Sequence, residues 1–168
     1  MEDSLEFNKL ITEFHIEPDV IKYCYQCSKC SDNCPVTAVT TDQYTDTGYN
    51  PRGNILMTLL GRKDSLLEGD DLKIWGCTVC VTCDVVCPQN IELVEIFTFL
   101  KNQSIALGKG PDSIYSQAKT VFENAKAIPL QPAIERRRGQ LGLTEVCRPD
   151  INEVQTLLKN IGVDKKLK

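Results

Sequence analysis

The sequence predicts a mainly α-helical fold. Apolar residues recur at helical spacing in several separate segments, and the period-two alternation typical of strands is nearly absent. Residues that favour helix starts and stops lie at the ends of most of these segments. Of the 168 residues, 42% are hydrophobic and 25% are charged, which is ordinary for a globular chain. We therefore expect one helical domain with a C-terminal arm.

A well-marked helix is expected after Asn50. Asparagine favours the N-cap position, and the Pro51 that follows suits the first helical residue. Gly61 is a typical helix stop. Between them lies an apolar stripe made of Ile55, Leu56, Leu59 and Leu60.

Other helices are expected on both sides of this one. Asp70 and Asp71 are expected to open a short second helix that carries Leu72 and Trp75 towards Cys77. Asn90 is expected to cap a third helix that Gly108 ends. The apolar stripe of that third helix consists of Leu93, Ile96, Phe97 and Leu100. Further helices are predicted over residues 5–14, 112–125 and 151–161.

Eight of the nine cysteines fall into two identical frames. The stretches CYQCSKCSDNCP (24–35) and CTVCVTCDVVCP (77–88) both read C-x2-C-x2-C-x3-C-P. A disulfide framework would require an oxidising compartment, and the acidic start MEDSLEF lacks the basic and apolar regions of a secretory signal. Structural zinc prefers two well-separated pairs of ligands, whereas here three cysteines arrive within seven residues. Both alternatives are therefore disfavoured.

The repeated frame is typical of bacterial proteins with two [4Fe–4S] clusters, in which the fourth cysteine of each run binds the other cluster. Three thiolates at positions i, i+3 and i+6 of a tight loop can bind three corners of one cubane. One cluster is accordingly predicted on Cys24, Cys27, Cys30 and Cys87, and the other on Cys77, Cys80, Cys83 and Cys34. Together with the helical pattern, this predicts an α-helical ferredoxin. Pro35 and Pro88 are each expected to start the helical segment that leaves a cluster.

The rest of the chain indicates electron transfer and shows no site that would bind and convert a substrate. No G-x-G-x-x-G or Walker frame is present, so no nucleotide or flavin site is indicated. His15 is the single histidine and no Ser/His/Asp set can be assembled, so no catalytic residue is predicted. The net charge of −4 without a concentrated basic face disfavours nucleic-acid binding. No uncharged run exceeds ten residues, so no transmembrane segment is expected. We expect a cytoplasmic protein.

Two features outside the frames have simple interpretations. Cys147 is expected to be a buried structural thiol. The run Arg136-Arg137-Arg138 is expected to be a solvated face, with docking onto an acidic partner as the alternative. Residues 1–108 are predicted to form the cluster-binding core, and residues 109–168 a helical arm for partner docking.

Several elements together resemble the iron–sulfur subunit of heterodisulfide reductase known as its C-type subunit. They are the first frame, the Asn50-Pro51-Arg52 element, Trp75-Gly76 before the second frame, and the helix after that frame. The later stretch RGQLGL (138–143) is also similar, so the resemblance covers most of the chain. Ser28 stands where the family often has glycine.

The resemblance implies an electron-transfer subunit found in methanogenic archaea and some other anaerobes. Its heterodisulfide reductase partners would be the A-type subunit, which carries flavin and iron–sulfur centres, and the B-type subunit, which reduces the CoM-S-S-CoB heterodisulfide. The chain has no adjacent Cys-Cys pair, so disulfide cleavage is expected in the B-type subunit. The alternative is an iron–sulfur subunit of a quinone-linked dehydrogenase or a sulfur-oxidation complex. A non-redox iron–sulfur sensor would need an effector module, which the sequence does not indicate.

Overall fold

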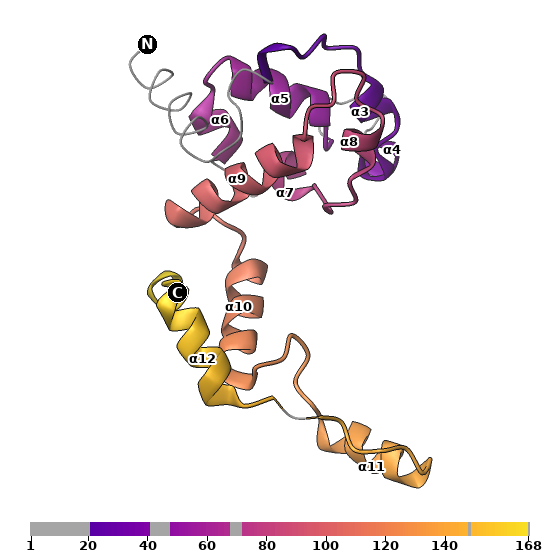
Figure 1. The fold of residues 1–168 in the computed structure, drawn as a ribbon, viewed down its shortest axis with the longest axis vertical. Coiled ribbons are helices and arrows are strands. Elements are labelled where there is room, and N and C mark those ends of the chain that lie inside the picture. Colours follow the sequence, from indigo (N-terminus) through magenta and orange to yellow (C-terminus); the bar gives the residue numbers. More distant parts are fainter. Residues whose placement is uncertain (1–20, 41–47, 68–71, 148, 168) are drawn as a thin grey trace. The chain divides into compact units, whose positions relative to one another are not determined.

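The computed structural model describes residues 21–40, 48–67, 72–147 and 149–167 (Figure 1). Within these ranges every regular element is a helix, which confirms the mainly α-helical prediction. None of these helices combines the length and apolarity needed to cross a lipid bilayer. The helix expected over residues 5–14 lies outside the described residues, as do His15, Asp70 and Asp71.

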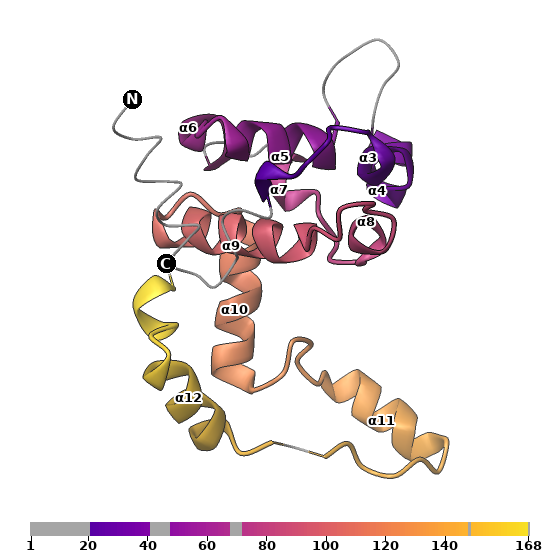
Figure 2. The same ribbon diagram turned by 45° about the horizontal axis from the view of Figure 1, so that its top comes forward.

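The chain divides into two compact units, with the division between Lys109 and Gly110. Figure 2 shows α5 and α6 along one side of α9 in the first unit, with α3, α4 and α8 near one end. Contacts join α9 to α6, α7 and α8, and join α5 to α3 and α6. The described part of this unit contains α3 (Lys29–Asp32), α4 (Pro35–Thr40), α5 (Pro51–Leu59), α6 (Lys63–Leu67), α7 (Leu72–Trp75), α8 (Thr82–Val85) and α9 (Leu93–Ala106).

Helix α5 begins and ends as predicted. The Asn50 side-chain oxygen accepts a hydrogen bond from the Gly53 backbone N–H (3.0 Å), which satisfies one of the free donors of the first turn. The same oxygen accepts from the Ser31 hydroxyl at 2.8 Å, so the cap also ties α5 to α3. Gly61 adopts a φ of +65°, the left-handed conformation that suits glycine after a helix.

The buried side of α5 differs from the predicted stripe. Leu56 and Leu60 are exposed, whereas Asn54 and Thr58 are buried. Asn54 donates its side-chain N–H to the backbone oxygen of Lys73 (2.9 Å) and so links α5 to α7. Thr58 donates its hydroxyl to the backbone oxygen of Asn54 at 2.7 Å. Because both polar groups are bonded, burying them is tolerated, and hydrophobicity alone could not reveal the buried side.

Helix α9 begins later than expected, at Leu93. Asn90 is not its N-cap, because Asn90 lies in a turn with a φ of +52°. Glu92 occupies the cap position, and the carboxylate of Asp84 in α8 accepts from the Val94 N–H at 3.1 Å. Pro88 also lies in this turn and starts no helix, whereas Pro35 begins α4 as predicted. The predicted stripe of α9 is buried.

The second unit contains, among its described residues, α10 (Asp112–Asn124), α11 (Pro132–Gln140), α12 (Ile151–Asn160) and the short 3₁₀ helix η1 (Asp164–Lys166). Helices α10 and α12 pack together. Gln155 donates to the Phe122 backbone oxygen (3.1 Å), and the Lys159 amine lies 5.9 Å from the centre of the Phe122 ring. The prediction for Cys147 was wrong, because its side chain is exposed in the segment that precedes α12.

Candidate metal centres

The two cysteine frames fold as structural repeats. Gln26 and Ser28 in the first frame have φ values of +55° and +68°. The equivalent residues of the second frame, Val79 and Val81, have φ values of +59° and +65°. A four-residue helix follows at the same offset in each frame, α3 in the first and α8 in the second, and these helices contact each other. The sequence repeat therefore produces two similar loops that lie side by side.

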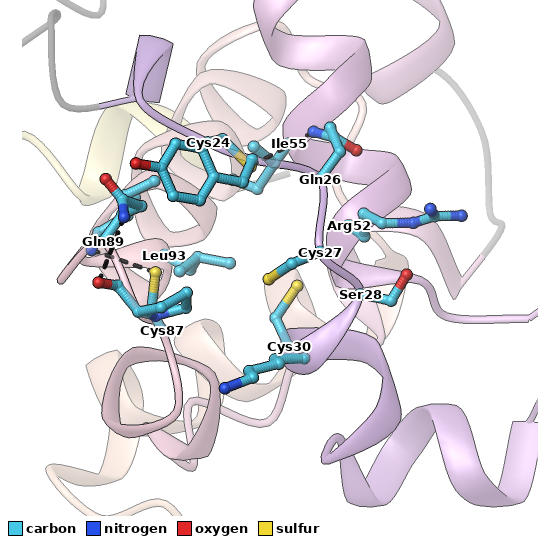
Figure 3. A pocket seen from close by; sticks show the side chains of 14 residues that line it. Cys24, Gln26, Cys27, Ser28, Cys30, Arg52, Ile55, Cys87, Gln89 and Leu93 are labelled. Atoms are coloured by element: carbon cyan, nitrogen blue, oxygen red, sulfur yellow. Dashed lines mark hydrogen bonds between the residues drawn. The ribbon is translucent and has the colours of Figure 1, made fainter.

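One cavity is lined by three cysteines of the first frame and one of the second, namely Cys24, Cys27, Cys30 and Cys87. In Figure 3 the sulfurs of Cys27 and Cys30 point into this space, and Cys87 faces them from the opposite side. Ile55 of α5 and Leu93 of α9 contribute apolar walls. The turn 88–91 follows the edge of this cavity, which explains why α9 cannot begin at Pro88.

The second cavity has the reverse composition. Three cysteines of the second frame and one of the first line it: Cys77, Cys80, Cys83 and Cys34. Tyr49, Val36 and Val94 complete much of its wall. Tyr49 was not anticipated from the sequence, because nothing in its local pattern indicates that it reaches the second frame.

The structure thus groups the cysteines as the predicted ligand exchange requires. The four cysteines that line each cavity match, in number and type, the ligand set of a [4Fe–4S] cluster. Their roles as ligands stay a prediction. Cys27 and Cys80, the second cysteines of the two frames, are both exposed. Cys34 and Cys83 are each only 8% exposed. The most exposed cysteine of each cavity is therefore the second cysteine of a frame.

Hydrogen-bond donors point at sulfurs in both cavities. The Ile91 backbone N–H donates to Cys87 Sγ, and the Val79 N–H donates to Cys77 Sγ, both at 3.4 Å. The Gln26 side-chain amide donates to Cys24 Sγ at 3.4 Å. Donors of this kind stabilise negative charge on sulfur and raise the reduction potential of a bound cluster.

The protonation of the thiols depends on burial. Burial raises the pKa of Cys83 to about 12, and the neighbouring Asp84 carboxylate contributes to this increase. Burial also raises the pKa of Cys30. At the exposed Cys80, hydrogen bonding with Thr82 lowers the pKa. Since a thiol must lose its proton to bind iron, metal binding has to displace protons from the buried cysteines.

The ligand loops contain backbone conformations that are costly for residues other than glycine. Val79 and Val81 are β-branched, and a positive φ is a clear outlier for such side chains. Ser28 adopts the same conformation, which explains physically why glycine would suit that position. Its side chain makes no cap hydrogen bond to α3 that would compensate.

Comparison with known proteins identifies the cofactor class. The sequence model of a family described as a 4Fe-4S dicluster domain matches residues 20–91, which include both frames. The chain is therefore an iron–sulfur protein, and the dicluster description is consistent with two clusters.

Relatives resemble the chain beyond the frames. It is 34% identical over 151 residues to the C2-type iron–sulfur subunit of the CoB–CoM heterodisulfide reductase of Methanocaldococcus jannaschii, covering 86% of this chain and 76% of the relative. It is 32% identical over 151 residues to the C2-type subunit of the H2/formate:CoB-CoM heterodisulfide,ferredoxin reductase of Methanococcus maripaludis, covering 86% and 77%. With the C-type iron–sulfur subunit of the CoB–CoM heterodisulfide reductase of Methanopyrus kandleri the identity is 28% over 168 residues, covering 95% and 83%.

Replacing Ser28 with glycine should stabilise the cluster-loaded protein. Glycine removes the left-handed strain, and we expect a gain of about 0.5–1 kcal/mol in the free energy of unfolding. Anaerobic guanidinium unfolding followed by circular dichroism measures this change. Ser28→Ala is the matched control, because alanine keeps the strain and should not stabilise. Equal stabilities of the glycine and alanine variants would contradict the strain argument.

Replacing Cys34 with alanine should damage the cluster of the second cavity, although Cys34 belongs to the first frame. After anaerobic reduction, Cys34→Ala should lack one of the two EPR signals. It should also lose about half of the bound iron. Cys147→Ala removes a thiol that lines neither cavity and should leave both signals intact.

The complementary variant identifies the signals. Cys87→Ala should remove the signal that Cys34→Ala preserves. If Cys34→Ala and Cys24→Ala abolish the same signal, each frame binds its own cluster and the exchange of ligands is wrong.

Proposed function

The chain belongs to the family of heterodisulfide reductase C-type subunits, iron–sulfur electron-transfer components of oxidoreductase complexes, and on that premise we propose that it relays electrons from a flavin-containing A-type subunit to a B-type subunit. The B-type subunit would use them to reduce the CoM-S-S-CoB heterodisulfide. A cytoplasmic location stays a prediction.

One observation carries the proposal: the two cysteine-lined cavities are built from both frames. Cys34 reaches the second cavity directly before α4, and Cys87 reaches the first cavity shortly after α8. Groups held by these two sets would lie next to each other, since α3 and α8 are in contact. Two adjacent redox centres form a short relay.

Each of the two cavities has an exposed cysteine, near which an electron could enter or leave the relay. Cys27 is exposed at the first cavity, and Cys80 is exposed at the second. A [4Fe–4S] cluster accepts and releases one electron at a time. Cleaving a disulfide into two thiols consumes two electrons and two protons, so two electrons must pass in succession, and the protons must be supplied where the disulfide is bound.

The second unit is the proposed docking element. Helix α11 has no buried residue, and apolar side chains around it are exposed to solvent. Leu141 and Leu143 are 60% and 51% exposed, and the Arg138 guanidinium holds the segment after the helix by donating to the Thr144 backbone oxygen at 2.9 Å. An ordered apolar surface of this kind favours association with a partner protein.

Anaerobic purification of the tagged full-length chain from its host tests the proposed function. We expect co-purification of a flavoprotein and of a second polypeptide with paired Cys-Cys-Gly motifs. In the purified complex, CoM-S-S-CoB should reoxidise the reduced clusters of this chain.

Two results would redirect the proposal. Co-purification with a quinone-linked dehydrogenase or a sulfur-oxidation enzyme, without heterodisulfide-dependent reoxidation, would support the alternative redox complex. Failure of CoM-S-S-CoB to reoxidise the clusters of an intact complex would contradict the assigned acceptor.

The double variant Leu141→Asp/Leu143→Asp should weaken assembly while both clusters remain bound. Losing two leucine contacts at an interface should raise the dissociation constant at least about tenfold, given roughly 1.5–3 kcal/mol per buried leucine. Leu60→Asp, at an exposed leucine of the first unit (59% exposed), is the matched control. Titration with the purified partner proteins measures the change. Undiminished affinity in the double variant would show that these leucines lie outside the docking surface.

A further inference from the structure

Tyr49 has a buried hydroxyl close to the cysteines of the second cavity. Its side chain is only 1% exposed, and the hydroxyl oxygen has no hydrogen-bond partner within the described parts of the chain. Leaving such a group unbonded costs about 1–3 kcal/mol. The same side chain lines the second cavity together with its four cysteines. A cluster bound in that cavity, through a sulfide or a cysteine sulfur, is therefore the natural acceptor.

The backbone of Tyr49 is fixed from α4, the helix that begins directly after Cys34. The Tyr49 N–H donates to the Thr40 hydroxyl oxygen at 3.1 Å. The Thr37 hydroxyl donates to the Tyr49 backbone oxygen at 2.8 Å. One short helix thus positions both the cysteine that crosses to the second cavity and the tyrosine beside it.

The ring of Tyr49 is held by close packing. It meets the Phe97 ring edge-on, with centroids 6.2 Å apart and planes at 75°. On another side it lies against the backbone at Gly76, where an added Cβ would come within 2.7 Å of Tyr49 Cδ2 and 2.9 Å of Tyr49 Cβ. Gly76 therefore leaves the space that the ring occupies, directly before Cys77.

The hydroxyl is a donor under all ordinary conditions. The ordinary pKa of a tyrosine hydroxyl is about 10, so the group carries its proton at neutral pH. The proton therefore stays on the oxygen. A protonated hydroxyl beside electron-rich sulfur can donate a hydrogen bond to it.

We propose that Tyr49 donates a hydrogen bond to the cluster held by Cys34, Cys77, Cys80 and Cys83, either to a sulfide or to the Cys77 sulfur, and so favours its reduced state. This rests on the proposed function, because it requires a cluster in the second cavity. Reduction adds negative charge to the cluster, and a donor to sulfur stabilises that charge. Tyr49 is thus a positioning and tuning residue that acts on one of the two centres. The tyrosine at the first cavity, Tyr25, is 70% exposed and is not buried in this way.

The test is Tyr49→Phe in the full-length, cluster-loaded chain, because phenylalanine keeps the ring and removes only the hydroxyl. We expect reduction of the second cluster to become about tenfold less favourable, which corresponds to a potential about 59 mV lower for one electron. The first cluster should keep its potential. Anaerobic potentiometric titration followed by EPR measures both, with the second signal identified as the one that Cys34→Ala removes. Tyr25→Phe is the control and should leave the potential of the second cluster unchanged.

If Tyr49→Phe fails to bind its cluster, a measurement on the unaltered protein still tests the inference. After reconstitution in D2O, electron–nuclear double resonance should detect an exchangeable deuteron coupled to the second cluster in addition to those of backbone amides. Its absence would overturn the inference, as would an unchanged potential in Tyr49→Phe with both clusters bound. A wild-type protein with only one cluster would instead contradict the proposed function.

Discussion

The crossing of one cysteine from each frame into the neighbouring frame's cavity is the constraint on which the structure depends. Cys34 and Cys87 can reach those cavities only if the two frames lie side by side, 53 positions apart in sequence. The contact between α3 and α8 meets this requirement directly. Between the two frames, the chain passes through α5, α6 and α7 before the second frame reaches the first. Helix α9 then packs against α6 and α7. The apolar core therefore lies directly against cysteines of both cavities.

The two cavities share a backbone design but differ in their surroundings. Both use a positive φ at two equivalent residues, and both place an amide N–H at a cysteine sulfur. The second cavity adds a buried tyrosine and two cysteines that are 8% exposed. Because burial lowers the potential of a cluster and hydrogen-bond donors raise it, these differences would allow one repeated loop to support two distinct potentials. A directional relay needs such a difference.

Much of this arrangement could be predicted from the sequence because its signals are local. The cap at Asn50 and the stop at Gly61 each act within a few residues. Helices α3 and α8 were missed, since four residues are too few to show a helical period. Asn90 was wrongly predicted to cap α9. The carboxylate of Asp84 in α8 accepts the hydrogen bond from the first turn of α9 instead. Tyr49 could not be anticipated, since its position depends on Gly76 and Phe97, which are distant in sequence.

The most direct test of the ligand exchange is a crystal structure of the anaerobically prepared, cluster-loaded chain with anomalous scattering at the iron absorption edge. It should contain two cubanes. Cys87 should be bonded to the cluster that also holds Cys24, Cys27 and Cys30, and Cys34 to the other cluster. A single cubane, or two cubanes each bound by all four cysteines of one frame, would contradict the account.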